Sequence, residues 1–133
     1  MKKQNLLRNQ EGFTLVEIIA VLIILGILAA VAVPRYIDLE ANAKIRAVDA
    51  AVSELNGRES LTWADVKISP SGYLSNGDTK VWDALDKDLG SDYKWTAGPN
   101  PSSGISTFTF KGDPFDVSRR ESTRSTPGIW VRK

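Results

Sequence analysis

The chain contains no cysteine and no histidine, and these two absences limit both its stabilisation and its chemistry. Small exported domains often depend on disulfides, and this chain cannot form one. The missing side chains are also the most common general base and the most common zinc ligands. The sequence has no Gly-x-Ser-x-Gly nucleophile motif and no phosphate-binding glycine loop. We therefore expect a non-enzymatic protein that needs no cofactor.

A strong charge imbalance is also lacking, because the net charge is +1 over 133 residues. This balance gives no indication of a nucleic-acid partner. The length allows one small domain in addition to a membrane element. Without disulfides, the carboxyl-terminal region must be held by strand pairing, by packing or by a metal.

A long apolar run stands near the amino terminus. Phe13 to Val33 is mostly apolar, and Ile18 to Val33 carries no charge. At ~1.5 Å per residue, the twenty-one residues from Phe13 form a helix of roughly 30 Å, which matches a bilayer core. The basic residues Lys2, Lys3 and Arg8 precede the run, so we expect the leader in the cytoplasm and the rest of the chain outside.

Glu17 is the unusual residue in this run, because a charge inside a bilayer costs at least ~2.5 kcal/mol. An ordinary signal peptide is the alternative, with Ala30-Val31-Ala32 as its cleavage site, and a plain signal-anchor helix is another. The uncharged stretch, however, exceeds the ~7–15 residues of a signal core. A carboxylate would also have no use in a discarded segment.

The segment Gly12-Phe13-Thr14-Leu15-Val16-Glu17 resembles the leader junction of type IV prepilins and of the pseudopilins of type II secretion. The resemblance implies cleavage after Gly12 by a prepilin peptidase and methylation of the new terminal residue, Phe13. It also implies that Glu17 pairs with the Phe13 amine of an adjacent subunit, and that Gly26 and Pro34 weaken the helix. Many pilins carry a carboxyl-terminal disulfide loop, from which this sequence departs.

The resemblance divides the chain into three parts. These are a leader at residues 1–12, a hydrophobic membrane and filament-core helix at 13–34, and an amphipathic helix with a globular domain at 35–133. We expect one helix from Phe13 to about Asn56, with a kink or local unwinding at Pro34 and with Asn56-Gly57 as its stop. Its apolar stripe after the membrane segment comprises Val33, Ile37, Ala41, Ile45, Val48, Val52 and Leu55.

The remaining chain predicts turns, one short helix and several strands. Turns are expected at 69–72, 76–78 and 98–104. The short helix is capped by Asp78 or Thr79, carries Trp82, Leu85 and Leu89 on one face, and ends at Gly90. Alternation around Tyr93, over Thr107–Phe110 and over Ile129–Val131 predicts a meander of three or four antiparallel strands on the helix.

This arrangement is an α+β fold that resembles the pilin fold, a long helix packed on a small antiparallel sheet. We expect it to bury Trp95, Phe108, Phe110 and Trp130. Of the four tryptophans, which are Trp63, Trp82, Trp95 and Trp130, at least three should be core residues rather than ligand platforms.

Two charged groups are weak candidate sites. Asp113 and Asp116 lie in a predicted loop and could bind calcium, but two aspartates fall short of a ligand set, and a solvated turn is the favoured interpretation. The basic residues near the end could contact an acidic partner, DNA or an anionic surface. We favour a solvated loop compensated by Glu121; the residues are Arg119, Arg120, Arg124, Arg132 and Lys133.

The favoured function is a structural subunit of a type IV pilus-like filament. It is inserted in the inner membrane with a single span, processed, and assembled by inner-membrane machinery into a helical homo-oligomer at the cell surface. A pseudopilin of type II secretion, or a minor tip pilin acting as an adhesive module, is the alternative. The leader motif is common to pilins and pseudopilins and does not separate them.

Overall fold

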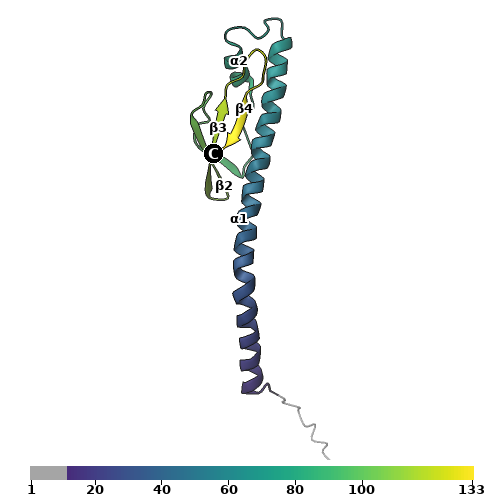
Figure 1. The fold of residues 1–133 in the computed structure, drawn as a ribbon, viewed down its shortest axis with the longest axis vertical. Coiled ribbons are helices and arrows are strands. Elements are labelled where there is room, and N and C mark those ends of the chain that lie inside the picture. Colours follow the sequence, from purple (N-terminus) through teal and green to yellow (C-terminus); the bar gives the residue numbers. More distant parts are fainter. Residues whose placement is uncertain (1–11) are drawn as a thin grey trace, which may run out of the picture. The chain divides into compact units, whose positions relative to one another are not determined.

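The structure is a computed structural model that describes residues 12–133, so residues 1–11 of the predicted leader lie outside the described residues. It contains two helices and one four-stranded sheet in the described range (Figure 1). The elements are α1 (Leu15–Ile68), α2 (Gly77–Ala84), β1 (Tyr93–Ala97), β2 (Ile105–Phe110), β3 (Asp113–Arg120) and β4 (Ile129–Arg132). The chain divides into two units, Met1–Ala41 and Asn42–Lys133.

The described part of the first unit is the amino-terminal portion of α1. Its apolar side chains are exposed, from Leu15 through Val33 to Leu39. An 18-residue window of this helix has a mean hydropathy of 3.0, which makes it long and apolar enough to cross a membrane. The helix passes through Gly26 and Pro34 without interruption.

In the second unit, α1 is amphipathic, and Val48, Val52 and Leu55 of the predicted stripe are buried. The predicted stop at Asn56-Gly57 is wrong, because α1 continues to Ile68. A glycine inside a helix costs about 1 kcal/mol. That cost is offset beyond Gly57 by the burial of Glu59 and Val66 on the helix. The helix ends just before Ser69-Pro70, because the ring of Pro70 clashes with the helical conformation of the preceding residue, Ser69.

The short helix α2 also differs from the prediction. It begins at Gly77, inside the predicted turn, and Asn76 occupies the N-cap position without a side-chain hydrogen bond. Asp78 and Thr79 therefore lie within the first turn and do not cap it. The helix ends at Ala84 rather than at Gly90, because Leu85 adopts an extended conformation. Leu85 is nevertheless buried, as the apolar pattern predicted.

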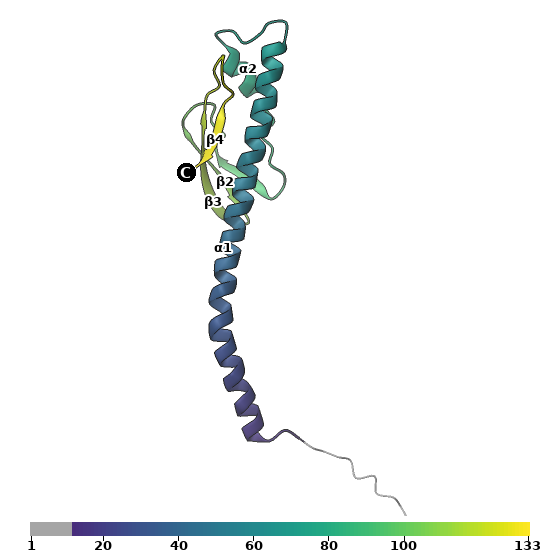
Figure 2. The same cartoon turned by 45° about the vertical axis from the view of Figure 1, so that its right-hand side comes forward.

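The sheet is an antiparallel meander in the order β1-β2-β3-β4, which confirms the predicted α+β layout (Figure 2). Strand β3 replaces a segment that the sequence indicated as loop. The β2–β3 connection turns at Lys111-Gly112, and both residues have positive φ, as a tight two-residue hairpin requires. Trp95 is only partly buried, whereas the other predicted core aromatics are buried. The main core comprises Val48, Val52, Leu55, Leu85, Phe108, Phe110, Val117 and Trp130.

Candidate functional site

The Gly12–Phe13 bond lies in a short non-helical segment that precedes α1. The side chain of Phe13 is 84% exposed. No heavy atom outside its chain neighbours lies within 4 Å of the Cβ position of Gly12. This bond therefore lies outside the helix in an exposed and uncrowded segment, where a peptidase could reach it.

Glu17 and Thr14 form reciprocal hydrogen bonds at the start of α1. The backbone N–H of Thr14 donates to Oε2 of Glu17 at 2.6 Å, and the N–H of Glu17 donates to Oγ1 of Thr14 at 3.2 Å. The carbonyl of Thr14 accepts the bond from Ile18 N–H at 3.2 Å. This arrangement is a capping box, in which two side chains satisfy backbone donors that the helix leaves unpaired.

The capping box gives the Glu17 carboxylate a fixed direction, because Oε2 is held by the backbone one turn earlier. The sequence pattern marked Glu17 as a charge in an apolar helix, and the family resemblance implied a partner in the Phe13 amine, but neither predicted a helix cap. The Thr-x-x-Glu spacing at positions 14 and 17 was the signal that could have identified its second role. Glu17 is exposed, so its carboxylate is accessible to a cation from outside this chain.

A second polar cluster, which the sequence analysis missed, lies buried in the second unit around Arg119. All five guanidinium N–H donors are used. Nε and Nη2 donate to the two oxygens of Glu59 at 3.0 and 2.5 Å. Nη2 and Nη1 also donate to the two oxygens of Asp78 at 2.7 and 3.1 Å. Nη1 makes a further bond of 2.5 Å to the carbonyl of Pro101.

We call Arg119, Glu59 and Asp78 the ionic cluster. Arg119 and Glu59 are both 0% exposed. Nε1 of Trp130 donates to Glu59 at 3.1 Å, and the Ser122 hydroxyl and N–H both donate to Asp78. The cluster connects α1, α2, β3, β4 and the 98–104 loop. It therefore links segments that a disulfide could otherwise have cross-linked.

The electrostatics of the ionic cluster favour the charged forms of Asp78 and Arg119. Burial alone would raise the pKa of Asp78, but the hydrogen bonds from Arg119 and Ser122 outweigh burial and hold that pKa below its usual value. Burial alone would lower the pKa of Arg119, but the hydrogen bonds and charges of Glu59 and Asp78 raise it. Among the described residues, no buried side-chain polar atom lacks a hydrogen-bond partner.

The interpretation of the terminal basic residues as one solvated loop is wrong for Arg119, which is buried on β3. Arg132 is also paired, because its Nε lies 2.7 Å from Oδ1 of Asp49 on α1. Arg120, Arg124 and Lys133 are exposed, as expected. The missed signal for the cluster was Glu59 itself, which continues the spacing of the buried stripe four residues beyond Leu55.

Asp113 and Asp116 lie on β3 and not in a loop. They are three residues apart on a strand, so their side chains leave opposite faces of the sheet. Asp113 pairs with Lys44 at 2.7 Å, and Asp116 accepts a hydrogen bond from Thr107 at 2.7 Å. In residues 12–133 there is no group of three or more ligand-type side chains that could hold a metal ion. The two aspartate side chains therefore do not point toward a common cation site.

Three of the four tryptophans belong to the core, as predicted. Trp130 is buried, and Trp82 and Trp95 are partly buried against the same cluster, each with its ring centroid 6.1 Å from that of Trp130. Trp63 lies apart, and its Nε1 donates to the carbonyl of Thr123 at 2.8 Å. None of these contacts suggests a free platform for a ligand.

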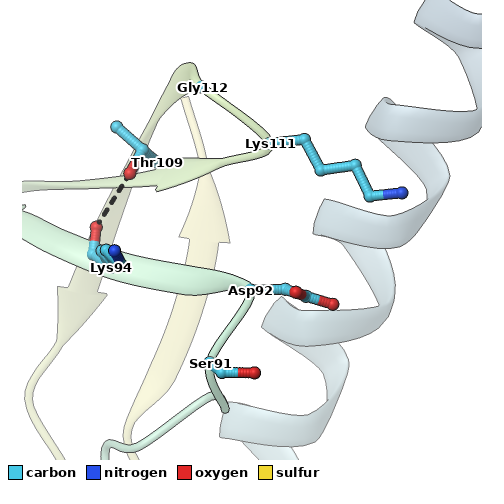
Figure 3. Close-up of a pocket in the computed structure, with 6 residues that line it drawn as sticks. All are labelled: Ser91, Asp92, Lys94, Thr109, Lys111 and Gly112. Atoms are coloured by element: carbon cyan, nitrogen blue, oxygen red, sulfur yellow. Dashed lines mark hydrogen bonds between the residues drawn. The ribbon is translucent and has the colours of Figure 1, made fainter.

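A shallow cavity of about 350 Å³ lies where β1 meets the β2–β3 turn (Figure 3). Lys111 and Asp92 both point toward α1, whereas the hydroxyl of Thr109 donates to the carbonyl of Lys94. The charges are mixed, and the lining contains no catalytic combination. The cavity is lined by Ser91, Asp92, Lys94, Thr109, Lys111 and Gly112.

Comparison with known proteins gives consistent results. Residues 7–33 match the family model described as the prokaryotic N-terminal methylation motif. The chain is 32% identical over 124 residues to the type IV narrow pilus major component PilA5 of Thermus thermophilus, covering 86% of this chain and 92% of that protein. It is 29% identical over 141 residues to a fimbrial protein of Pseudomonas aeruginosa, covering 93% and 85%. No solved structure matches.

Proposed function

We propose that this chain, which belongs to the type IV pilin family and is a structural pilus subunit, matures by cleavage between Gly12 and Phe13 and by methylation of the new Phe13 amine. The match of residues 7–33 to the methylation motif supports this proposal. The exposed, non-helical Gly12–Phe13 segment supports it independently. The partners at this step are a prepilin peptidase and its methyltransferase activity.

Before assembly, the subunit crosses the inner membrane once through the apolar part of α1. The exposed apolar side chains and the mean hydropathy of 3.0 support this placement. Lys2, Lys3 and Arg8 precede the span and favour a cytoplasmic amino terminus, so the globular domain lies outside the cytoplasm. Inner-membrane machinery then moves the subunit into a surface filament, where neighbouring helices replace lipid around α1.

Glu17 directs this assembly by pairing with the Phe13 amine of a neighbouring subunit. When α1 enters a bundle of apolar helices, a lone carboxylate becomes costly. Cleavage after Gly12 creates the cation that can neutralise it. The capping box supports the proposal, because Thr14 holds Oε2 of Glu17 and so orients the carboxylate at the end of α1. Repeated head-to-tail contacts of this kind do not close and therefore generate a helical filament.

Two alternatives are less well supported. A pseudopilin shares the leader motif, but relatives that cover most of this chain are named as a pilus component and a fimbrial protein. A minor tip pilin with an adhesive site would need a ligand-binding cleft, and the shallow cavity near Lys94 carries mixed charge. The name "major component" of the Thermus relative favours a major subunit.

Substitutions of Glu17 test the assembly mechanism. Glu17→Gln keeps a capping-box side chain but removes the charge, whereas Glu17→Leu removes both. Both variants should insert and be cleaved normally, since the span loses a charge and the Gly12–Phe13 bond is intact. Both should yield few or no filaments, and Glu17→Asp should be intermediate because it keeps the charge with less reach.

The assay compares membrane and sheared-filament fractions, with mass spectrometry of each variant as the control for processing. Filament loss in Glu17→Leu with normal yield in Glu17→Gln would assign Glu17 to helix capping alone. Normal filament yield from both variants would show that the carboxylate has no role in assembly.

A further inference from the structure

The last strand, β4, forms one edge of the sheet and pairs with β3 only. Lys133 N–H donates to the carbonyl of Asp116 at 2.9 Å, so the backbone groups of Lys133 face β3. Backbone groups in a strand alternate in direction, and those of Val131 and Ile129 therefore also face β3. Trp130 lies three residues before Lys133, so its backbone N–H and C=O point away from β3. An outward pair of this kind is an open position for another strand.

The side chain of Asn56 occupies that open position. Trp130 N–H donates to Oδ1 of Asn56 at 2.7 Å, and Nδ2 of Asn56 donates to the carbonyl of Trp130 at 2.9 Å. A carboxamide carries one acceptor and one donor group, like a peptide unit, so it can satisfy both at once. Aspartate could accept from the N–H but could not donate to the carbonyl, and leucine could do neither.

Neighbouring contacts hold α1 along the same edge. Two residues after Trp130, Arg132 bonds to Asp49 at 2.7 Å, and Asp49 lies about two helical turns before Asn56. Nε1 of Trp130 also donates to Glu59, three residues after Asn56. Three α1 side chains therefore contact β4, namely Asp49, Asn56 and Glu59, and the outer two hold the helix beside the strand on either side of Asn56.

The other edge of the sheet is protected by different means. Strand β1 carries Lys94 and has an irregular register between Trp95 and Ala97, and Pro99 follows it closely. Charge, bulge and proline each discourage the addition of a strand. Figure 3 shows Lys94 on this edge, with its carbonyl bonded to Thr109.

Strand β4 has fewer of these devices. Its sequence, Ile129-Trp130-Val131-Arg132, is rich in residues that favour strands and has no proline, and its pairing with β3 is regular. Val131 is 50% exposed. Without Asn56, this segment would present an apolar, strand-forming edge with an open backbone pair.

We propose that Asn56 closes the β4 edge and thereby determines how copies of this chain associate, excluding strand-to-strand pairing and leaving the helix-mediated contacts of the pilus. The proposal rests on the pilus-subunit function for its biological meaning, but the edge closure itself is a property of the single chain. A second copy of β4 is the partner that Asn56 excludes.

The test uses the full chain in detergent, with Asn56→Leu, Asn56→Asp and the control Ser53→Ala. Ser53 is exposed on the same helix, and its hydroxyl donates to the carbonyl of Asp49 at 2.8 Å. Hydrogen exchange of the Trp130 amide should become about tenfold faster or more in Asn56→Leu, because its acceptor is lost. Asn56→Asp should retain most of this protection, and Ser53→Ala should match the wild type.

Association is measured by a second readout that exploits the absence of cysteine. Val131→Cys introduces a single thiol on the exposed face of β4. Under oxidation, the disulfide-linked dimer should increase several-fold when Asn56→Leu is added and should increase less with Asn56→Asp. Should Asn56→Leu fail to fold, as judged by tryptophan fluorescence, the dimer yield of Asn56→Asp is the test, and a yield equal to that of Val131→Cys alone would overturn the role in association.

Unchanged exchange at Trp130 in Asn56→Leu would overturn the edge closure. Faster exchange without additional dimer would overturn the role in association. Neither result depends on filament formation, so the absence of wild-type filaments would instead count against the pilus function.

Discussion

The two units of this chain use the same helix in opposite ways. In the first unit, Leu25 is 55% exposed and resembles its neighbours, because the helix is apolar on all sides. In the second unit, Leu55 is 0% exposed, and the apolar residues form one buried stripe beside exposed polar faces. An all-round apolar helix needs lipid or other helices around it, whereas a striped helix can be satisfied by its own domain.

The charged residues show the same difference. Glu59 is enclosed by donors from its own chain, and every guanidinium N–H of Arg119 has an acceptor. Glu17 bonds to Thr14 within its own chain but is exposed, and its proposed counter-charge belongs to another subunit. The buried charges of the second unit are therefore satisfied within this chain, whereas the apolar side chains of the first unit are left exposed by the single chain.

The largest expected effect on stability comes from breaking the ionic cluster. Arg119→Leu leaves the carboxylates of Glu59 and Asp78 without their shared cation. Removing one partner of a buried ion pair costs about 3–5 kcal/mol. Thermal unfolding followed by tryptophan fluorescence should show this loss, since all four tryptophans lie in the second unit.

Arg120→Leu is the matched control, because Arg120 is the next residue on β3 and is exposed. Its melting temperature should stay close to that of the wild type. Equal melting temperatures for the two variants would show that the ionic cluster does not stabilise the domain.

The same substitution in both units sharpens the comparison directly. Leu55→Ala should destabilise the domain by about 2–5 kcal/mol, because it opens a cavity in a closed core. Leu25→Ala should leave the unfolding of the second unit unchanged, since its side chain is exposed in the single chain. Filament yield should fall in Leu25→Ala if neighbouring subunits cover this residue. A shift of the tryptophan-monitored transition in Leu25→Ala would contradict the separation of the two units.

A smaller effect is expected from acid. The pKa of Asp78 is lowered from its ordinary value of 3.8, because its hydrogen bonds with Arg119 and Ser122 outweigh burial. Its contribution to stability is therefore fully present above that value and is lost as the pH falls through the lower, folded-state pKa. Asp78→Asn should have a lower melting temperature than the wild type at neutral pH. The difference between the two melting temperatures should become smaller as the pH falls below 3.8. If the difference in melting temperature between the two proteins stayed constant down to the pH at which both unfold, ionised Asp78 would make no contribution to stability.

The sequence predicted the elements whose periodicity is clear and missed those in which polar residues are buried. The apolar run and strand β2 follow simple patterns, and each was found, whereas the predicted stripe is buried only from Val48 to Leu55 and is exposed at Ile37 and Ile45. Strand β3 was missed because Arg119 faces the core, and a buried arginine cannot be distinguished from a surface one by periodicity alone. The extension of α1 was missed because Asn56-Gly57 is a common helix stop, yet here Asn56 bonds to the backbone of β4.

The functional residues also divide into those with a local sequence signal and those that meet only in the folded chain. Gly12, Phe13 and Glu17 are predicted from a local motif of neighbouring residues, and their roles in processing and assembly remain proposals. The ionic cluster could not be predicted in this way, because its members are 60 and 41 residues apart in the chain and meet only through the fold. Long-range pairing of buried charges leaves no periodic signal in a single sequence.

The central claim is that cleavage creates the amine that Glu17 needs in the filament. Mass spectrometry of protein from sheared filaments tests it most directly, by determining the first residue and its modification. The account predicts a mature chain that begins at Phe13 and carries a methyl group on its amine. A chain that begins at Val33, after Ala30-Val31-Ala32, would lack Glu17 altogether and would contradict the account.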